Sequence, residues 1–556
     1  MSDQVASTQR HESHLNEGQE PVPALWPVLL LCAIAAVWID FGTIHRYHNA
    51  DSLLPVLVSL YRWTLFYWEQ DRMGMLVPLL ALPFKNPFVN LLVQDGLVIF
   101  CGLATMCLVV RYVLPYTVWP VVGLLSIASF LVLVPPEYRF EFLVNQPYGV
   151  SLALGLSGLI VAELRQVRWF PWWRHGTALV LICLAHWVNV AVAIVLIFLV
   201  TFRDVFSTQS AQWRIAQNWR KVWSWGIREH QMMRVSGQKP YHGIVSAICL
   251  LPREMISRVR RAANADVAVA ILFVITGAVF GAVLTRLAPY GATRAGLLPL
   301  SAWPVAWKHL IMNTWMALAP GQWVPRLAWA VGGSLLFCCA PGIRQRASIA
   351  LRAAMTLTAV AVTYCLLIGS LEWVRANQFW FRYLIPSVIF LQVALMVIVV
   401  MPPCAVLGEK VSKGFYALSV PFLILILTYT YGFPSLAAAR SDIDRVAGAR
   451  TPDVLAAQAT HIVGRYWEVW TTVFHANLVL YERSEGRVIW GVTVRSRPTE
   501  SLWDLTALEK LCVAIPLHDQ LAVGYLQLYR FPPLVLVEQR PTVSILRPEA
   551  AMRPKN

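Results

Sequence analysis

Carboxylates and arginines gather in one short stretch of the chain, residues 48–75, where most of the other residues are apolar. Asp51 comes just after His48, and the sequence "WEQDRMG" (68–74) then adds Glu69, Asp71 and Arg72. A carboxylate that is partly withdrawn from water can serve as a general base or as a metal ligand. Asp51 and Asp71 are therefore candidate catalytic residues, with His48, Glu69 and Arg72 as candidate substrate-binding residues. The alternative is that all of them are ordinary solvated loop charges.

Three further stretches place polar side chains at the ends of apolar segments: "PPEYRFEFLVNQPYG" (135–149), "HWVN" (186–189) and "LEWVRANQFWFRYLIPS" (371–387). The candidate substrate-binding residues in them are Glu137, Arg139, His186, Asn189, Arg375 and Arg382. Arginine is suited to bidentate contact with a phosphate group. The alternatives are a packing role for His186 and interfacial anchoring for the two late arginines.

Composition decides what kind of element must position these residues. The chain has 556 residues, of which 57% are hydrophobic and only 14% are charged, whereas soluble domains carry roughly 25% charged residues. Apolar stretches of about 18 residues or more recur along the chain, and each predicts a membrane span. We expect an α-helical polytopic membrane protein. The net charge of +16 then indicates basic cytoplasmic loops and not a nucleic-acid partner.

Nine spans follow directly from these stretches: 25–42, 91–113, 117–135, 148–164, 266–287, 324–340, 350–371, 384–403 and 414–433. The first is not expected to be a cleaved signal peptide, because no A-x-A-like site follows it. The largely apolar stretch between Asp51 and Glu69 should lie on the membrane and hold both carboxylate groups near its surface.

The stretch 177–200 is long enough for one span, but a single span would place the strongly basic segment 202–265 outside the cell. That placement violates the positive-inside rule. Two short helices that meet at "HWVN" remove the conflict, and His186 would then point into an extracytoplasmic cavity. This gives about eleven membrane segments, with the N-terminus inside and the C-terminus outside. One span with a rule-breaking loop is the alternative.

The outer segments predict further structure. "LPLSAWPVAWKHLIMNTWMALAPGQW" (298–323) indicates interfacial helices anchored by Trp303, Trp307, Trp315 and Trp323. We expect a disordered cytoplasmic N-terminus (1–24), a transmembrane module (25–433) and a small α/β extracytoplasmic domain (434–556). In that domain, 453–477 should form one amphipathic helix, 478–496 should be β-rich, and residues after about 541 should be disordered.

Common nucleotide, metalloprotease, hydrolase and redox motifs are absent from the sequence. The arrangement instead resembles the GT-C class of polytopic glycosyltransferases. The resemblance lies in an Asp in the first outer loop ("NADSLLPVLVSLYRW", 49–63), many later spans, an "RYLIP" motif (382–386) opening a late span, and "GRYWEVW" (464–470) in the tail.

The resemblance implies a polyprenyl-phosphate-linked sugar donor and a glycan, lipid or protein acceptor of the cell envelope. It implies Asp51 as base or metal ligand, and Arg382 or Arg375 on the donor phosphate. Some members carry a paired Asp–Glu or Asp–Asp in this loop, but the neighbours of Asp51 are Ala50 and Ser52. Dependence on a divalent cation, Mg²⁺ or Mn²⁺, therefore stays open.

The expected location is the inner membrane of a bacterium, in contact with its lipids. Two other classes stay open. A secondary transporter would need ionisable residues inside the spans and often shows repeated halves, and neither is evident in the sequence. A non-catalytic, lipid-binding membrane protein would scatter the polar residues named above, whereas an enzyme would bring them to one outward-open cavity.

Overall fold

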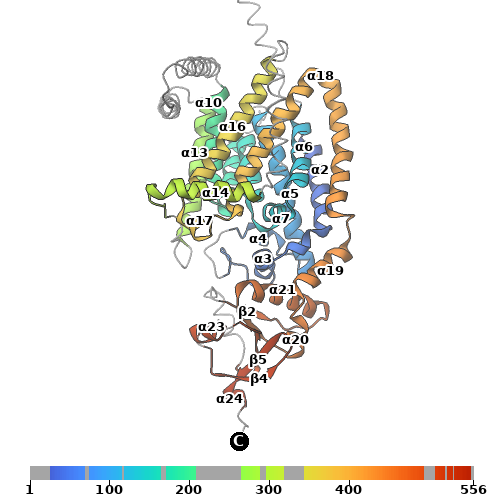
Figure 1. Ribbon diagram of the computed structural model, residues 1–556, viewed down its shortest axis with the longest axis vertical. Coiled ribbons are helices and arrows are strands. Elements are labelled where there is room, and N and C mark those ends of the chain that lie inside the picture. Colours follow the sequence, from blue (N-terminus) through green and yellow to red (C-terminus); the bar gives the residue numbers. More distant parts are fainter. Residues whose placement is uncertain are drawn as a thin grey trace, which may run out of the picture.

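The computed structural model describes residues 25–68, 74–114, 118–163, 171–207, 265–287, 296–317, 344–493, 508–519, 522–529 and 531–552. A bundle of long helices forms one part of the molecule, and a small α/β domain covers one end of that bundle (Figure 1). The bundle helices are α2 (Leu25–Asp40), α5 (Pro87–Val113), α6 (Trp119–Leu133), α8 (Tyr148–Glu163), α9 (Pro171–Val188), α10 (Val192–Ser207), α13 (Ala265–Arg286), α16 (Arg344–Gly369) and α18 (Ile385–Tyr431).

The bundle has the character of a multi-pass membrane protein. In the described part of the chain, five helical stretches are long and apolar enough to cross a membrane: Pro87–Val113, Val267–Arg286, Ile349–Gly369, Phe381–Val400 and Ala417–Ala447. Large apolar side chains remain exposed on them, including Leu272, Val279 and Leu425, as expected of helices that face lipid. The expected total of eleven segments is not confirmed, and the predicted span 324–340 lies outside the described residues.

The predicted break in 177–200 is present. Helix α9 ends at Val188 and α10 begins at Val192. The Oδ1 atom of Asn189 accepts a hydrogen bond from the backbone N–H of Ala191, which closes the turn. Arg203 near the end of α10 pairs with Glu163 at the end of α8, 2.6 Å away. The chain therefore returns to the end of the bundle from which α9 starts, and the single-span alternative is wrong.

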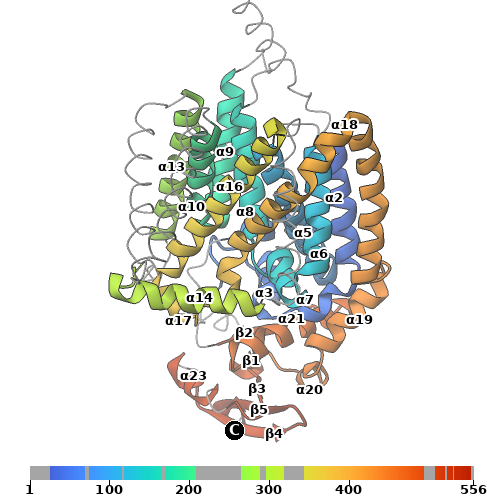
Figure 2. The ribbon, with the colours of Figure 1, turned by 45° about the horizontal axis from the view of Figure 1, so that its top comes forward.

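Late in the chain, α18 contains most of both predicted spans, 384–403 and 414–433. Figures 1 and 2 show it as two arms that meet at the end of the bundle opposite the α/β domain. Helix α14 (Trp303–Ala317) lies across the bundle (Figure 2), as expected of an interfacial helix. Its two described indoles are tied to protein, because Trp303 and Trp307 donate to the carbonyls of Leu298 and Leu366. The side chain of Trp315 and residue 323 lie outside the described part.

The C-terminal region forms a five-stranded mixed sheet with the order β2-β1-β3-β5-β4. The strands are β1 (His461–Val463), β2 (Trp490–Val492), β3 (Val513–Pro516), β4 (Leu534–Gln539) and β5 (Val543–Pro548). Strand β1 pairs in parallel with β2 and β3, whereas β5 pairs antiparallel with β3 and β4. The helices are α19 (Leu436–Ala447), α20 (Thr451–Ala456), α21 (Tyr466–Glu482), α23 (Ala522–Leu528) and α24 (Glu549–Met552).

Three predictions for this region were wrong. The single amphipathic helix over 453–477 is a helix–strand–helix unit made by α20, β1 and α21. The stretch 478–496, predicted to be β-rich, begins with the end of α21, and its described part, up to residue 493, has one three-residue strand, β2. Residues 542–552 are ordered and not disordered as predicted, because β5 pairs with two strands and Val543 and Ile545 are buried in the domain core.

Candidate active site

Asp51 is held by the way helix α3 (Ala50–Leu60) begins. Asn49 caps this helix, and its Oδ1 accepts the backbone N–H of Asp51 at 2.9 Å. The Oγ of Ser52 accepts the N–H of Asn49 at 3.0 Å, which completes a capping box. A carboxylate in the first turn is favoured by the helix dipole. The local sequence therefore fixes the position of Asp51 in the first turn of α3. Its side chain is only 7% exposed.

Two partners from distant parts of the chain meet the Asp51 carboxylate. The Tyr466 hydroxyl, at the start of α21, donates to Oδ1 at 2.9 Å. The Arg382 guanidinium, in the 3₁₀ turn Phe381–Leu384, has Nη1 3.6 Å from Oδ2. Arg382 also donates to the Tyr383 hydroxyl at 3.1 Å and lies over the ring of Trp380. A carboxylate, a phenol and a guanidinium therefore converge where the bundle meets the α/β domain.

A cavity borders Asp51. It lies between α3, α4 (Leu76–Ala81), α5 and the π-helical turn Glu141–Asn145. Its polar lining consists of Asp51, Ser52, Gln94, Asp95 and Asn145, and its apolar lining includes Tyr67, Val77, Val98 and Val144. Single π-helical turns occur often at functional sites. An apolar cavity with a few converging polar groups is a typical small-molecule or lipid site.

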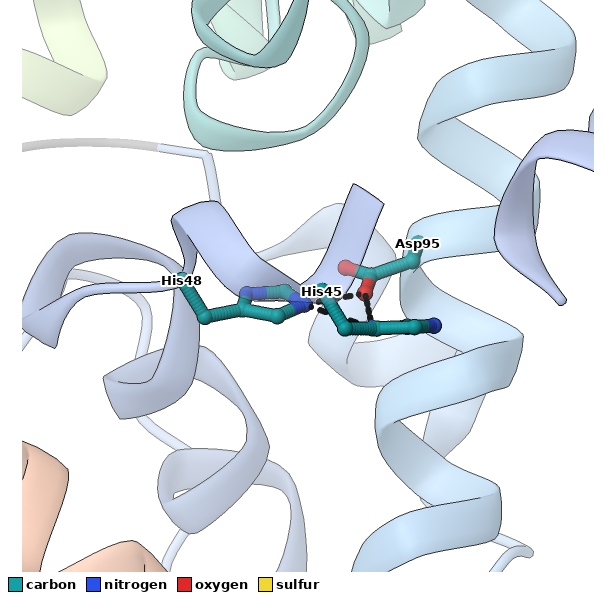
Figure 3. A group of neighbouring side chains, drawn as sticks. All are labelled: His45, His48 and Asp95. Carbon is teal, nitrogen blue, oxygen red and sulfur yellow. Dashed lines mark hydrogen bonds and ion pairs between the residues drawn. The ribbon is translucent and has the colours of Figure 1, made fainter. Parts of the chain in front are cut away.

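A second polar cluster borders this cavity. His45 and His48 come from the segment after α2, and Asp95 reaches them from α5 (Figure 3). The Nε2 atom of His48 lies 3.0 Å from Oδ2 of Asp95 and 2.9 Å from Nδ1 of His45. All three residues are buried. The pKa of His45 is lowered from 6.5 to about 4, chiefly by burial and also by the nearby His48, while Asp95 opposes the shift.

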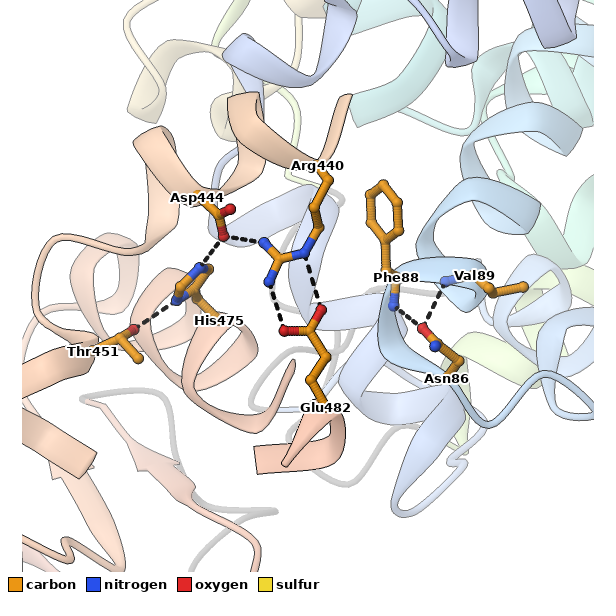
Figure 4. A network of polar contacts seen from close by, with 8 residues as sticks. All are labelled: Asn86, Phe88, Val89, Arg440, Asp444, Thr451, His475 and Glu482. Carbon is orange, nitrogen blue, oxygen red and sulfur yellow. Dashed lines mark hydrogen bonds and ion pairs between the residues drawn. The ribbon is translucent and has the colours of Figure 1, made fainter. Parts of the chain in front are cut away.

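A polar network joins the helices of the α/β domain that lie next to the bundle (Figure 4). Arg440 on α19 donates to both carboxylate oxygens of Glu482 on α21, at 3.1 and 3.0 Å, and also pairs with Asp444. Asp444 accepts from His475, whose ring also contacts Thr451. The Arg440 guanidinium lies over the ring of Phe88 at the start of α5. This contact, with the packing of α21 against α3, holds Tyr466 at Asp51.

The predicted surface position of the apolar stretch after Asp51 needs correction. Helix α3 does not lie bare on a membrane. Leu53, Leu54 and Val58 are fully buried, because α3 packs between α5 and α21. Glu69, Asp71 and Arg72 lie outside the described residues, so their proximity to Asp51 stays a prediction. His48 is close to Asp51 in the chain, and its Nδ1 contacts the Ser52 hydroxyl at 2.9 Å.

The predicted binding residues that the structure describes do not belong to the lining of the cavity, and four of them lie elsewhere in the fold. Glu137 is exposed. Arg139 donates to the carbonyl of Leu131 in α6 at 2.6 Å and lies over the ring of Tyr431 in α18, so it contacts both helices. His186 does not point into a cavity. It is fully buried, its Nδ1 contacts the carbonyl of Ile182, and a Cβ added at Gly277 of α13 would lie 2.6 Å from that atom. Asn189 serves the turn described above.

The two late arginines, which sequence alone did not rank, now differ clearly. Arg375 in α17 (Glu372–Ala376) is exposed, whereas Arg382 reaches Asp51. The Arg382 side chain is 14% exposed, so it still has access to solvent or to a ligand.

Sequence reasoning missed three of the residues found here. Asp95 is a single carboxylate inside an apolar span, and His45 belongs to no spaced motif. Tyr466 lies in "GRYWEVW", a stretch that carried a family resemblance but gave no sign of a contact with Asp51. Asn145 was visible beside Glu141 as one of several loop polar residues, and its Nδ2 donates to that carboxylate at 3.0 Å.

Comparison with known proteins gives no family model and no curated protein that matches this chain. Two solved structures of ArnT from Cupriavidus metallidurans align with nearly the whole chain. The structure bound to undecaprenyl phosphate has a TM-score of 0.48 at 11% identity, and the alignment covers 95% of this chain and 99% of that one. The apo structure has a TM-score of 0.31 at 12% identity, covering 96% and 100%. TM-scores below 0.5 at such identities do not establish a common fold.

Proposed function

We propose that this protein is a membrane glycosyltransferase. It transfers a sugar from a polyprenyl-phosphate donor to a hydroxyl of a cell-envelope acceptor, with inversion at the anomeric carbon. The observation that carries the proposal is the meeting of Asp51, Arg382 and Tyr466 beside a cavity at one end of an apolar helix bundle. The proposed location is the inner membrane, with the α/β domain on the outer face.

The two charged groups match the two needs of the reaction. A departing lipid phosphate gains negative charge, and a guanidinium stabilises that charge at the site where it develops. An acceptor hydroxyl must lose its proton as it attacks, and a carboxylate can accept it. Arg382 takes the first role and Asp51 the second. A single base opposite the leaving group needs no covalent sugar–enzyme intermediate, hence the inversion.

The arrangement also suggests how the resting site is kept intact. Without a donor, Arg382 and Asp51 are each other's counter-ion, so neither charge is buried alone. A phosphate that binds Arg382 would take its place as the ion-pair partner. Asp51 would then keep its hydrogen bond from Tyr466 and face the acceptor.

The buried carboxylates bear on the transporter alternative. Asp40 and Asp95 are ionisable residues in bundle helices, which the sequence reasoning overlooked. Asp40 is the last residue of α2, and Asp95 is in the early part of α5. Both lie toward the end of the bundle that carries the α/β domain, whereas a transport site is expected near the membrane midplane. Their position favours a site at the membrane surface.

The test is sugar transfer by the purified full-length protein in proteoliposomes. A set of polyprenyl-phosphate-linked sugars serves as donors, with extracted envelope lipids and glycans as acceptors, and the matching sugar nucleotides serve as the control donors. We expect transfer from at least one lipid-linked donor and none from the sugar nucleotides. Binding of polyprenyl phosphate without turnover of any donor would instead support a lipid-binding protein.

A further inference from the structure

The cluster of His45, His48 and Asp95 has the geometry of one face of a metal site. Its three inner atoms are Nδ1 of His45, Nε2 of His48 and Oδ2 of Asp95 (Figure 3). They form a triangle with sides of 2.9, 3.0 and 3.8 Å. Ligand atoms bound tetrahedrally to zinc at about 2.0–2.1 Å lie about 3.3 Å from one another. The triangle therefore has the size that one such ion requires.

The outer atoms of the two rings decide which nitrogen carries hydrogen. The Nε2 atom of His45 contacts the backbone carbonyl of Asp40, and a carbonyl can only accept. The Nδ1 atom of His48 contacts Oγ of Ser52 at 2.9 Å. When the single hydrogen of the Ser52 hydroxyl is on the carbonyl of Asn49, 3.0 Å away, Oγ accepts from His48. In this hydrogen-bond arrangement both outer nitrogens are the N–H donors of neutral rings.

The inner atoms are consequently all acceptors. With the hydrogen on each outer nitrogen, the inner nitrogens of His45 and His48 present lone pairs, and Asp95 adds a carboxylate oxygen. Among the residues that the structure describes, Oδ2 of Asp95 is buried and has no hydrogen-bond partner. Three buried lone pairs at these distances repel one another unless a metal ion or a proton lies between them. Outer partners that fix the tautomer of each ring are also the usual second shell of a metal-binding histidine.

We propose that His45, His48 and Asp95 bind one divalent transition-metal ion, with zinc as the best-matched metal. Two imidazole nitrogens and one carboxylate oxygen suit zinc or a neighbouring transition metal, whereas magnesium favours an all-oxygen shell. This differs from the Mg²⁺ or Mn²⁺ that the family resemblance left open, and it places the ion on residues other than Asp51. The inference does not depend on the proposed glycosyl transfer.

The ion would position the neighbouring cavity wall. It would tie the segment after α2 to α5 through Asp95, and the His48–Ser52 contact would extend that tie to the first turn of α3. Ser52 is the next residue after Asp51, and both line the cavity with Asp95. His45, His48 and Asp95 are therefore proposed as positioning residues and not as groups that touch a substrate.

The first experiment measures metal uptake by the full-length protein in nanodiscs, purified with a tag that contains no histidine. The protein is stripped with a chelator, dialysed, and reloaded with zinc, cobalt or magnesium salts in turn. We expect one equivalent of zinc or cobalt, the visible absorption bands of a low-coordinate cobalt site, and no competition from magnesium. No uptake of either transition metal by the wild type would overturn the proposal, and would mean that a proton shared by the cluster replaces the ion.

The second experiment removes single ligands. His48→Gln and Asp95→Asn each delete one ligand, and His309→Gln is the matched control at an exposed histidine outside the cluster. Losing even an outer partner of a metal ligand costs about 10–100-fold in affinity, so each ligand variant should lose at least that much. The control should bind as the wild type does. Equal zinc affinity in the wild type and both ligand variants would overturn the assignment.

A folding defect in the ligand variants would not leave the question open. Zinc should raise the unfolding temperature of the stripped wild type, because a ligand that binds only the folded state stabilises it. This measurement needs no variant. A wild-type unfolding temperature that zinc and cobalt leave unchanged would count against the site as directly as a failure of uptake.

Discussion

The hydroxyl of Tyr466 lies 2.9 Å from Oδ1 of Asp51, although 415 residues separate the two in the chain. The contact joins the first helix of the site to the α/β domain, so the domain forms part of the candidate active site. Arg382 reaches the other carboxylate oxygen from a third region of the chain.

We expect Tyr466→Phe to weaken the docking of the domain and to slow sugar transfer. A hydrogen bond to a charged group contributes about 1.5–3 kcal/mol, and 1.4 kcal/mol corresponds to about tenfold in rate. Thermal unfolding and the transfer rate both report the change. Tyr481→Phe, at an exposed tyrosine on the same helix, is the control. Equal rates and unfolding temperatures in the two variants would remove Tyr466 from the site.

Arg382→Ala should lower turnover by about 10²–10³-fold, the usual effect of removing a donor that stabilises transition-state charge. Arg382→Lys should recover little, because an ammonium does not reproduce the planar fork of the guanidinium. Arg375→Ala is the comparison and should cost much less, since Arg375 is exposed. Turnover is measured together with the amount of inserted protein. Full activity in both Arg382 variants would reduce that residue to an interfacial anchor.

The contrast between these arginines shows what the sequence could and could not supply. Both lie in the segment before a late span, but Arg375 belongs to the short helix α17, whereas Arg382 belongs to the 3₁₀ turn Phe381–Leu384 and reaches Asp51. Asp51 was predictable because an acidic residue in the segment that follows the first apolar span is visible in one sequence. Asp95 was not, because one carboxylate within a long apolar run has the pattern of an ordinary span. Tyr466 depended on how an entire domain packs.

The helix bundle followed from hydropathy, and the break at residues 189–191 followed from charge. The many basic residues after 202 favour the cytoplasmic side of the membrane, so the chain must return to the side from which α9 starts. This signal comes from the charge of a whole loop and does not depend on any single residue. The role of His186 was not accessible in this way, since a histidine next to a turn can face a cavity or a neighbouring helix. The helix wrongly predicted at 453–477 is another case in which a local pattern fits more than one structure. Its apolar spacing suits a helix, but parallel pairing with β2 and β3 makes His461–Val463 a strand.

The stability of the α/β domain should fall as the pH drops from 6.5 toward 4. Burial lowers the pKa of His461 from 6.5 to about 4, so the unfolded chain binds this proton first and the folded domain is penalised below pH 6.5. The shift corresponds to about 3 kcal/mol in full. Burial also lowers the pKa of His475, in the same direction.

The measurement is chemical unfolding of the full chain at several pH values, followed by a fluorescent probe attached in the α/β domain. His461→Gln serves as the comparison, because it removes the titrating group while keeping a polar side chain. We expect a shallower pH dependence in that variant between pH 6.5 and 4. Identical slopes for the two proteins would contradict the assigned role of His461.

The proposed orientation predicts which loops are accessible. In a background without native cysteines, Arg483→Cys should react with a membrane-impermeant thiol reagent in intact spheroplasts, since this side chain is 59% exposed in the α/β domain. Gln209→Cys, which lies outside the described residues, should react only after the membrane is permeabilised. Labelling of position 209 from outside would contradict the proposed topology.

Turnover of Asp51→Asn is the most direct test of the central claim that Asp51 is the base of a sugar transfer. The asparagine keeps the shape of the side chain and loses the proton-accepting carboxylate, so the protein should remain folded and inserted. We expect transfer from the lipid-linked donor in proteoliposomes to fall by about 10²–10⁴-fold, the range for loss of a general base. Asp71→Asn should cost less, and Glu538→Gln, at an exposed acid of β4, should transfer at the wild-type rate. Near wild-type transfer by Asp51→Asn would contradict the account.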